Sequence, residues 1–213
     1  MDRMGRARLL AIFLALPLAV ISAEDEVTKA PYVEVGDCWS YQTTGTEFRG
    51  APTEYEVCVV FIDTAKDVIM AVATTKADGK EVETSYSLRW DPRVTRTRLI
   101  IPSGTRFFRF PMRAGDTFET EYEFKDAQRG PNAGKAKMRH KVVGWESVTV
   151  PAGTFRGMRT DSEGTVQRYD RMYTFAQTQS TWYVPEVNRV VKYRYENPDR
   201  WVQEELTGYR LKK

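Results

Sequence analysis

The sequence predicts an all-β protein, a single domain whose antiparallel sheet is strongly curved or forms a half-open barrel. Turn residues divide the chain into segments of strand length that are rich in Val, Thr, Tyr and Phe. In one segment Val191, Tyr193 and Tyr195 alternate with Lys192 and Arg194, the period of a strand with one buried face and one wet face. Helix signals are scarce, so we expect strands almost throughout.

Residues 1–23 have the order of a secretory signal peptide. Three arginines precede an apolar run from Leu9 to Val20, and small residues follow it up to Ala23. The run is too short to cross a bilayer, which needs ~20 apolar residues. We therefore expect cleavage after Ala23 and an exported mature domain, residues 24–213, that is periplasmic or secreted and has no transmembrane segment. No cysteine follows the run directly, so a lipid-modified N-terminus is not expected.

The charge of the mature domain is balanced. Residues 1–23 hold three of the 32 basic residues and one of the 29 acidic residues, so their removal leaves 29 basic and 28 acidic residues. Such a chain has no overall attraction to nucleic acid or to an anionic membrane. We predict no nucleic-acid partner.

The two cysteines, Cys38 and Cys58, are predicted to form a disulfide, because thiols in one small exported domain are usually paired. A hairpin of residues 39–47 and 54–62, turning near residues 48–50, would bring the two sulfurs together. The alternative is two unreactive core thiols, which a shift of one residue in register would favour.

The clearest hairpin joins residues 67–76 to residues 81–90. Asp78-Gly79 lies between them and supplies the positive φ angles that a tight turn needs. Further turns are predicted at Asp91-Pro92, Pro102–Gly104, Gly130–Asn132, Pro151–Gly153, Pro185-Glu186 and Asn197–Asp199.

Two segments are harder to assign. From Val166 to Ala176 the apolar spacing suits a short helix or an extended strand; we favour a strand for the second half and leave residues 164–171 open. Residues 130–137 are predicted to be a mobile loop, because their Gly, Pro, Asn and Lys residues offer nothing to bury.

Residues 35–41 have a weak sequence similarity to residues 114–120. In both, Gly-Asp turns the chain and an aromatic residue opens the next strand. The similarity indicates either duplication of a half-domain, with the halves meeting near residue 111, or two independent occurrences of a favourable turn sequence.

Two longer motifs have a structural interpretation. In residues 148–155, a Pro-Ala-Gly corner ends one strand, and Gly153 permits the reversal before Phe155 returns to the core. In residues 182–192, Pro185 opens a short connection, and we expect Val187 to fold back beneath it as a plug.

With Gly115–Phe118, these two motifs make the second half recognisable. In their order and spacing, over residues 111–211, they resemble the DUF3108-like family of exported bacterial proteins. The resemblance implies an antiparallel β domain in a Gram-negative envelope. It implies no activity, because the family has none that is settled.

The sequence contains no recognisable catalytic motif. We therefore predict a protein that is not an enzyme and has no cofactor or metal. His140, the only histidine, lies among cations and is interpreted as an ordinary strand residue. The sequence has no glycine-rich phosphate loop, no metalloprotease histidine pair and no Gly-x-Ser-x-Gly turn. Glu119, Glu121 and Glu123 alternate along a predicted strand, as on a solvated face.

A basic and aromatic segment offers a candidate anionic-surface site. Arg96, Arg98, Arg106 and Arg109 lie close to aromatic residues in sequence, and guanidinium groups beside rings can bind phosphates. The alternative is arginines on the wet side of a strand, where they discourage aggregation.

The favoured function is a noncatalytic binding or carrier module. In this hypothesis the concave side of the sheet, with Trp39, Tyr41, Trp90 and Trp182, encloses an apolar or amphipathic, lipid-like ligand. One alternative is an assembly factor that binds another envelope protein. The other is a hydrolase acting on envelope polymers.

Overall fold

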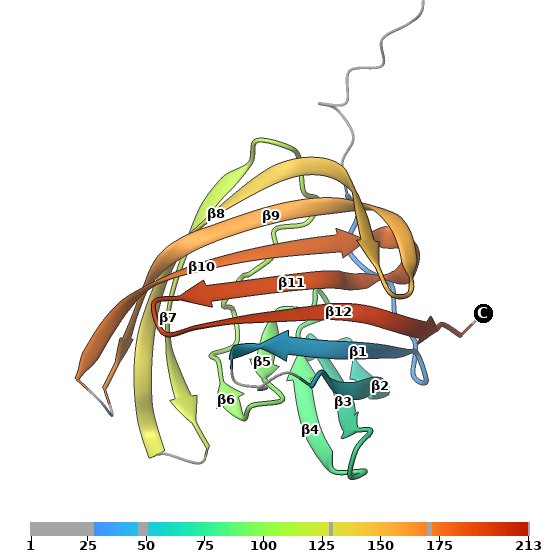
Figure 1. Cartoon of the computed structure of the whole chain (residues 1–213), viewed down its shortest axis with the longest axis horizontal. Coiled ribbons are helices and arrows are strands. Elements are labelled where there is room, and N and C mark those ends of the chain that lie inside the picture. Colours follow the sequence, from blue (N-terminus) through green and yellow to red (C-terminus); the bar gives the residue numbers. More distant parts are fainter. Residues whose placement is uncertain (1–27, 47–50, 128–129, 170–171, 213) are drawn as a thin grey trace, which may run out of the picture.

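The strands form one closed antiparallel barrel. The computed structural model describes residues 28–46, 51–127, 130–169 and 172–212, without the side chains of residues 130–132. Each strand pairs with its neighbours in sequence, and β1 pairs with β12 to close the wall (Figure 1). The prediction of an all-β single domain is confirmed, and the sheet closes on itself. The predicted signal peptide and the turn near residues 48–50 lie outside the described residues.

The strands differ widely in length, from two residues to 21. Their bounds are β1 Cys38–Gly45, β2 Thr53–Asp63, β3 Val68–Thr75, β4 Glu81–Tyr86, β5 Pro92–Val94, β6 Leu99–Ile100, β7 Thr117–Asp126, β8 Gly130–Val150, β9 Gly153–Arg168, β10 Tyr173–Val184, β11 Arg189–Asn197 and β12 Arg200–Arg210. A 3-10 helix, η3 (Pro185–Val187), joins β10 to β11.

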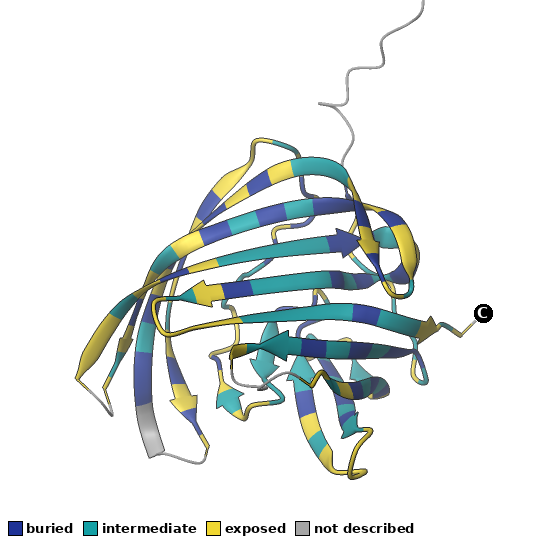
Figure 2. Cartoon of the chain, viewed as in Figure 1, coloured by how far each residue is buried: buried dark blue, intermediate teal, exposed yellow. Residues whose placement is uncertain are grey.

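Alternating residues build the core. In β2, Tyr55, Val57 and Val59 are buried, whereas Glu54 and Val60 are exposed. The same alternation appears as bands of burial along most strands (Figure 2). Each fully buried side chain of this size contributes about 1.5–3 kcal/mol through the hydrophobic effect.

The largest apolar cluster joins the beginning of the chain to its end. It holds inward-facing residues of β1, β2 and β3 together with Val187, Val191 of β11 and Leu206 of β12. Trp39 of β1 and Ile69 of β3 are fully buried in it. The core therefore stabilises the same β1–β12 pairing that closes the barrel.

Residues 101–112, here called the inner segment, connect β6 to β7 and pack against the inner face of the wall. The ring of Phe107 lies 5.3 Å from that of Tyr122 in β7, and the ring of Phe110 lies 5.0 Å from that of Tyr183 in β10. Strands β5 and β6 are short, and β6 pairs with β7 at only two residue pairs. The inner segment thus supplies side-chain packing where the wall has few backbone hydrogen bonds.

The prediction of a mobile loop at residues 130–137 is wrong. These residues begin β8, which pairs with β7 on one side and β9 on the other. Ala133 and Ala136 are buried, so the segment does contribute to the core. At Gly134 a Cβ atom would lie 2.2 Å from the carbonyl oxygen of Gln167, so close packing requires this glycine.

The segment that suited either a helix or a strand is extended. Residues up to Arg168 belong to β9, and β10 begins at Tyr173, which confirms the strand favoured for the second half. In the part of the chain that the structure describes, no helix has both the length and the apolar character needed to cross a membrane.

Three predicted connections are confirmed. Gly79, with φ +67°, lies between β3 and β4, and Gly153, with φ +140°, follows the corner between β8 and β9. Val187 is fully buried at the end of η3, as expected for a plug.

The two Gly-Asp turns have the same hydrogen bonds. The amide of Gly36 donates to the carbonyl of Val59, and that of Gly115 donates to the carbonyl of Val142, both at 2.8 Å. Each aspartate side chain also accepts a bond from the amide three residues before it, at 2.8 Å for Asp37 and 3.0 Å for Asp116. The sequence similarity therefore corresponds to one turn geometry that occurs twice, before β1 and before β7.

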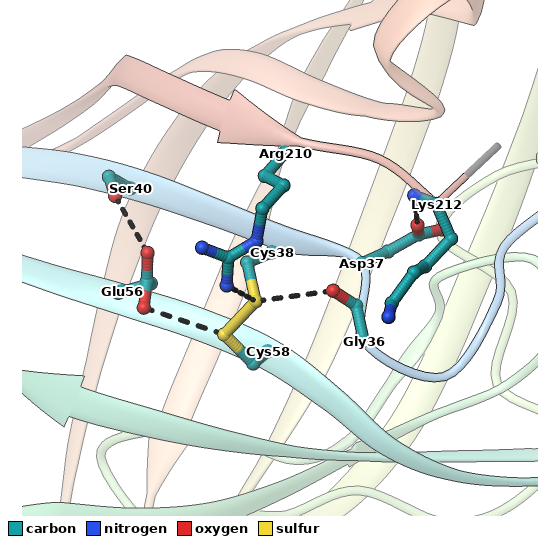
Figure 3. The surroundings of a disulfide bond; sticks show 8 residues. All are labelled: Gly36, Asp37, Cys38, Ser40, Glu56, Cys58, Arg210 and Lys212. Carbon is teal, nitrogen blue, oxygen red and sulfur yellow. Dashed lines mark hydrogen bonds between the residues drawn. A yellow bond between two sulfur atoms is a disulfide. The ribbon is translucent and has the colours of Figure 1, made fainter.

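Cys38 and Cys58 are joined in a disulfide between β1 and β2, where the two residues are directly paired (Figure 3). Arg210 of β12 places its guanidinium Nη2 3.2 Å from the Cys38 sulfur. The alternative of two unreactive thiols is therefore excluded. The bond fixes the register of the first hairpin beside the strand that closes the barrel.

A buried carboxylate fastens the inner segment to the turn between β4 and β5. Asp91 Oδ1 accepts hydrogen bonds from the amides of Phe107 at 2.7 Å and Phe108 at 3.1 Å. Its Oδ2 accepts one from the Ser87 hydroxyl at 3.0 Å and lies 3.2 Å from Arg106 Nη1. Burial raises the pKa of the Asp91 carboxyl, against the lowering effect of these donors.

We expect the double substitution Cys38→Ala/Cys58→Ala to lower the free energy of unfolding by about 3 kcal/mol, since the disulfide closes a loop with a sequence separation of 20 residues. Urea unfolding of the oxidised protein and of the variant measures the difference. A reducing agent should destabilise the unsubstituted protein and leave the variant unchanged. A loss below 1 kcal/mol would contradict the prediction.

Asp91→Asn should lower the free energy of unfolding by about 2–3 kcal/mol, because the amide keeps one acceptor and presents a donor to Ser87 and Arg106. Thermal and urea unfolding measure it. Glu123→Gln, at an exposed position of β7, is the control and should change stability by less than about 0.5 kcal/mol. Equal stability of the two variants would show that the carboxylate does not fasten the inner segment.

Candidate functional site

The candidate site surrounds Arg189, a buried arginine at the start of β11. Arg189 is paired with Val184, which is fully buried, and its guanidinium lies against the buried rings of Trp39 and Trp90. The side chain therefore enters the interior, and only 9% of the residue is exposed.

Four aromatic rings surround the guanidinium, and we call this group the Arg189 cage. The guanidinium carbon lies 4.0 Å from the ring centroid of Trp90, 4.9 Å from Trp39, 5.1 Å from Tyr86 and 5.9 Å from Tyr41. The rings of Trp39 and Trp90 meet edge to face at 5.3 Å. Each close cation–π contact in a desolvated site contributes up to about 2 kcal/mol.

Hydrogen bonds hold three of these rings on the backbone that carries Arg189. The indole nitrogen of Trp39 donates to the carbonyl of Val187 at 2.8 Å, and that of Trp90 donates to the carbonyl of Asn188 at 2.7 Å. The Tyr41 hydroxyl donates to the carbonyl of Val190 at 2.7 Å. The polar ends of these rings are thus occupied, and the position of the guanidinium is fixed.

The backbone at the cage is strained. Trp90 has φ +64° and Asn188 has φ +54°, and a left-handed conformation is costly for a bulky residue such as tryptophan. The turn that holds Trp90 is closed by the Asp91 amide, which donates to the Ser87 hydroxyl at 3.1 Å. Strain of this kind concentrates at functional sites.

A stack of rings leads from the cage to a second arginine. The rings of Tyr41 and Tyr55 are stacked at 5.5 Å, and the guanidinium of Arg96 lies 4.2 Å from the centre of the Tyr55 ring. Arg96 Nη2 is also 3.3 Å from Oε1 of Glu204, which β12 directs into the barrel. We call Arg96, Tyr55, Tyr41 and Glu204 the aromatic column.

The two arginines differ in charge compensation. Arg96 is paired with Glu204, whereas no carboxylate among the described residues lies within 4.0 Å of Arg189. Nη1 of Arg189 is buried without a hydrogen-bond partner, and Nη2 has a contact of 3.4 Å with the Tyr86 hydroxyl. Burying an unpaired charge costs several kcal/mol, which the surrounding rings offset in part.

The tyrosine hydroxyls do not supply the missing negative charge. Burial raises the pKa of Tyr41 and of Tyr55, with a smaller contribution from neighbouring charges. Burial likewise raises the pKa of Tyr193 in β11, whose ring also faces inward. These groups stay neutral at physiological pH, so the Arg189 cage carries a net positive charge.

Solvent reaches the interior beside the aromatic column. The side chains of Arg96 and Glu204 are each 26% exposed although both lie inside the wall. Tyr86 and Tyr193 also face inward and are half-buried. The charged and aromatic groups at this place are therefore in contact with water.

Two depressions lie on the outer wall, with volumes of about 430 and 440 Å³. The first is lined by Arg159, Trp182, Lys192 and Arg194, and the second mainly by exposed residues of β7 to β10. Neither includes a residue of the Arg189 cage. We regard the cage as the better candidate because its buried charge is incompletely paired, whereas the outer residues form mutual ion pairs such as Lys192–Glu205 at 2.9 Å.

The structure brings together three of the four aromatic residues predicted to bind ligand. Trp39, Tyr41 and Trp90 all belong to the cage. Trp182 lies elsewhere: its indole nitrogen donates to Glu146, and its ring lies 5.3 Å from the guanidinium of Arg159.

The four predicted arginines do not form one surface. Arg96 lies in the aromatic column, and Arg106 is paired with Asp91. Arg98 is exposed at a turn, and Arg109 lies 4.7 Å from the ring of Phe118. One member of this set thus belongs to the same interior site as the aromatic residues.

The residues predicted from the sequence do not include Arg189, Tyr55, Tyr86 and Glu204. A signal for Arg189 was present, since the two-residue period of Val191, Tyr193 and Tyr195 extends back to position 189. No local signal relates Glu204 to Arg96, because they are 108 residues apart.

His140 and the acidic residues occupy structural positions. His140 is buried, its Nδ1 is 2.7 Å from the Ser162 hydroxyl, and its ring stacks on Phe118 at 4.5 Å. Burial is the main reason that the pKa of His140 falls to about 4, and Arg109 adds to the effect. The glutamates at 119, 121 and 123 are exposed on β7.

One cluster has the composition of a metal site. Cys38, Glu56 and Cys58 bring possible ligand atoms within 4.8 Å of one another. The two sulfurs are bonded to each other, so neither is a thiolate that could ligate a metal.

Comparison with known proteins shows the fold alone. No protein-family model matches the chain, and no curated protein matches its sequence. The chain is similar to the structure of a candidate lipoprotein from Parabacteroides distasonis ATCC 8503, with a TM-score of 0.54 and 14% identity over 86% of this chain and 100% of that one. A candidate exported protein with a YmcC-like fold from Bacteroides fragilis NCTC 9343 gives a TM-score of 0.54 and 15% identity, over 86% and 99% of the two chains. The DUF3108-like resemblance stays a prediction.

The pKa of His140 predicts a pH dependence of stability. It is about 4 in the folded protein against 6.5 for a free histidine, so the unfolded chain binds the proton more readily between these values. The contribution of His140 is complete above pH 6.5 and is lost as the pH falls toward 4. Relative to His140→Asn, we expect the free energy of unfolding to fall by about 2 kcal/mol from pH 7 to pH 5. Urea unfolding at both pH values measures it, and parallel pH profiles would contradict a neutral buried imidazole.

Proposed function

We propose that the chain is an exported, noncatalytic binding module that holds a lipid-like amphiphile inside its barrel. The observation that carries this proposal is the Arg189 cage beside an interior that solvent reaches at Arg96 and Glu204. Ligand sites commonly combine apolar and aromatic walls with a few polar groups that orient the ligand. This interior has both.

Support for export comes from two sources. Residues 1–23 have the order of a secretory signal, and the solved structures that share the fold are described as those of a lipoprotein and an exported protein. The disulfide is consistent with an oxidising compartment. We therefore place the protein in the periplasm or outside the cell.

The polar and apolar parts of the interior suit an amphiphile. Tyr193 and Tyr86 offer ring faces to a hydrocarbon chain, while Arg96, Glu204 and Arg189 can orient a polar head group. Neighbouring inward residues, such as Thr181, are small and uncharged. Burial keeps the hydroxyls of Tyr41 and Tyr193 protonated, so these two groups are not general bases.

One observation favours assembly with another envelope protein as a second function. On the side of β7 that faces β6, Lys125 and Asp126 are paired, and among the described residues the rest of this edge has no strand partner. Such an edge can accept a strand from another chain. Crosslinking at Glu119 in intact cells distinguishes this function from carriage of a small ligand.

Solvent extraction of the natively purified protein, followed by mass spectrometry, tests the proposal. We expect one amphiphile per chain, and at least fivefold lower occupancy in Tyr193→Ala, because this ring faces the interior. Arg194→Ala alters the next residue of the strand, on the outer wall, and should leave occupancy unchanged. Absence of an extracted amphiphile, together with no uptake of added brominated long-chain alcohol or carboxylate, would contradict the proposal.

A further inference from the structure

We propose that the ligand of the barrel interior is an anionic amphiphile whose head group pairs with the guanidinium of Arg189. The inference rests on the proposed binding function and adds the charge and position of the head group. The head group is a carboxylate or a phosphate, because the oxygens of both groups match the planar donors of arginine.

The charge balance of the interior is the first argument. Arg96 and Glu204 neutralise each other at 3.3 Å, and the buried carboxylate next to the cage, Asp91, is engaged by Arg106 at 3.2 Å. Arg189 has no such partner among the described residues. An anion at the cage would therefore supply the one countercharge that the protein does not.

The hydrogen-bonding capacity of Arg189 is the second argument. Nη1 has no partner, and the contact of Nη2 with the Tyr86 hydroxyl is long, at 3.4 Å. The cage rings hold the guanidinium through their π systems, and the donors of Trp39 and Trp90 are already engaged by the backbone. The Nη1 donors of the guanidinium are consequently left for a ligand.

Access to Arg189 is controlled by the groups nearest to it. Nη1 is buried, and Tyr86, which contacts Nη2, is the half-buried ring of the cage. A shift of the Tyr86 side chain would uncover the guanidinium. Glu204 holds Arg96 of the adjoining aromatic column in a neutral ion pair, so Arg96 adds no net attraction for an anion.

This arrangement gives two substitutions with opposite effects. Arg189→Met removes the charge that attracts the head group and keeps a long side chain. Glu204→Gln removes the carboxylate and leaves the positive charge of Arg96 without its partner. We therefore expect the first to weaken binding of an anionic amphiphile and the second to strengthen it.

Binding is measured at pH 8 by calorimetry and by the fluorescence of tryptophan, since Trp39 and Trp90 contact Arg189. The probes are dodecanoate, dodecyl phosphate, methyl dodecanoate and dodecyltrimethylammonium, each below its micellar concentration, with acetate and inorganic phosphate as small anions. We expect the anionic amphiphiles to bind at least tenfold more tightly than the ester and the cation. In Arg189→Met this preference should vanish, and in Glu204→Gln it should rise at least threefold.

Arg194→Met, on the outer wall of the same strand, is the matched control and should retain the preference. Equal binding of dodecanoate and its methyl ester by the unsubstituted protein would overturn the inference while leaving the proposed function intact. If no amphiphile binds, both fail. Small anions that bind as tightly as dodecanoate, and only when Arg189 is present, would support the anion site and contradict the amphiphile. The probe comparison and Glu204→Gln decide the question even if Arg189→Met does not fold.

Discussion

The burial of the Arg189 guanidinium among aromatic rings is the interaction on which the interior of this barrel depends. Trp39, Tyr41 and Trp90 come from β1 and from the turn after β4, yet all three donate hydrogen bonds to the backbone between Val187 and Val190. The rings thus fix the position of the guanidinium, and their attraction to its positive charge explains why they lie together. Because β1 also pairs with β12, the same contacts help to close the wall.

The two halves of the chain fill the barrel in different ways. Inward residues of β1 to β3 pack directly against η3, β11 and β12 in one apolar cluster. The long strands β7 to β10 instead receive the inner segment, which the Asp91 carboxylate fastens by two backbone amides. The interior is therefore divided, and the charged residues Arg96 and Glu204 remain open to water.

Local features of the sequence predicted the fold better than the site. Asp78-Gly79 and Val187 could be assigned because their conformations depend on neighbouring residues. Residues 130–137 could not, because β8 owes its extended form to hydrogen bonds with β7 and β9, which local composition does not show. Trp182 was grouped with the interior aromatic residues because it is an aromatic residue in a predicted strand. Only the strand pairing shows that Tyr183 faces inward and Trp182 outward.

The energetics of Arg189 favour a functional explanation over a structural one. A buried charged group is often less stabilising than well-packed apolar side chains of similar volume, so packing alone would favour leucine or methionine at this position. The strained backbone of Trp90 and Asn188 adds a further cost at the same place. Proteins tend to retain destabilising features at the sites where they bind a ligand. A cation held in a ring of aromatic groups, with one nitrogen unpaired, meets that description. The rings fix the position of the guanidinium, so an anion that binds there has to displace only the Tyr86 side chain.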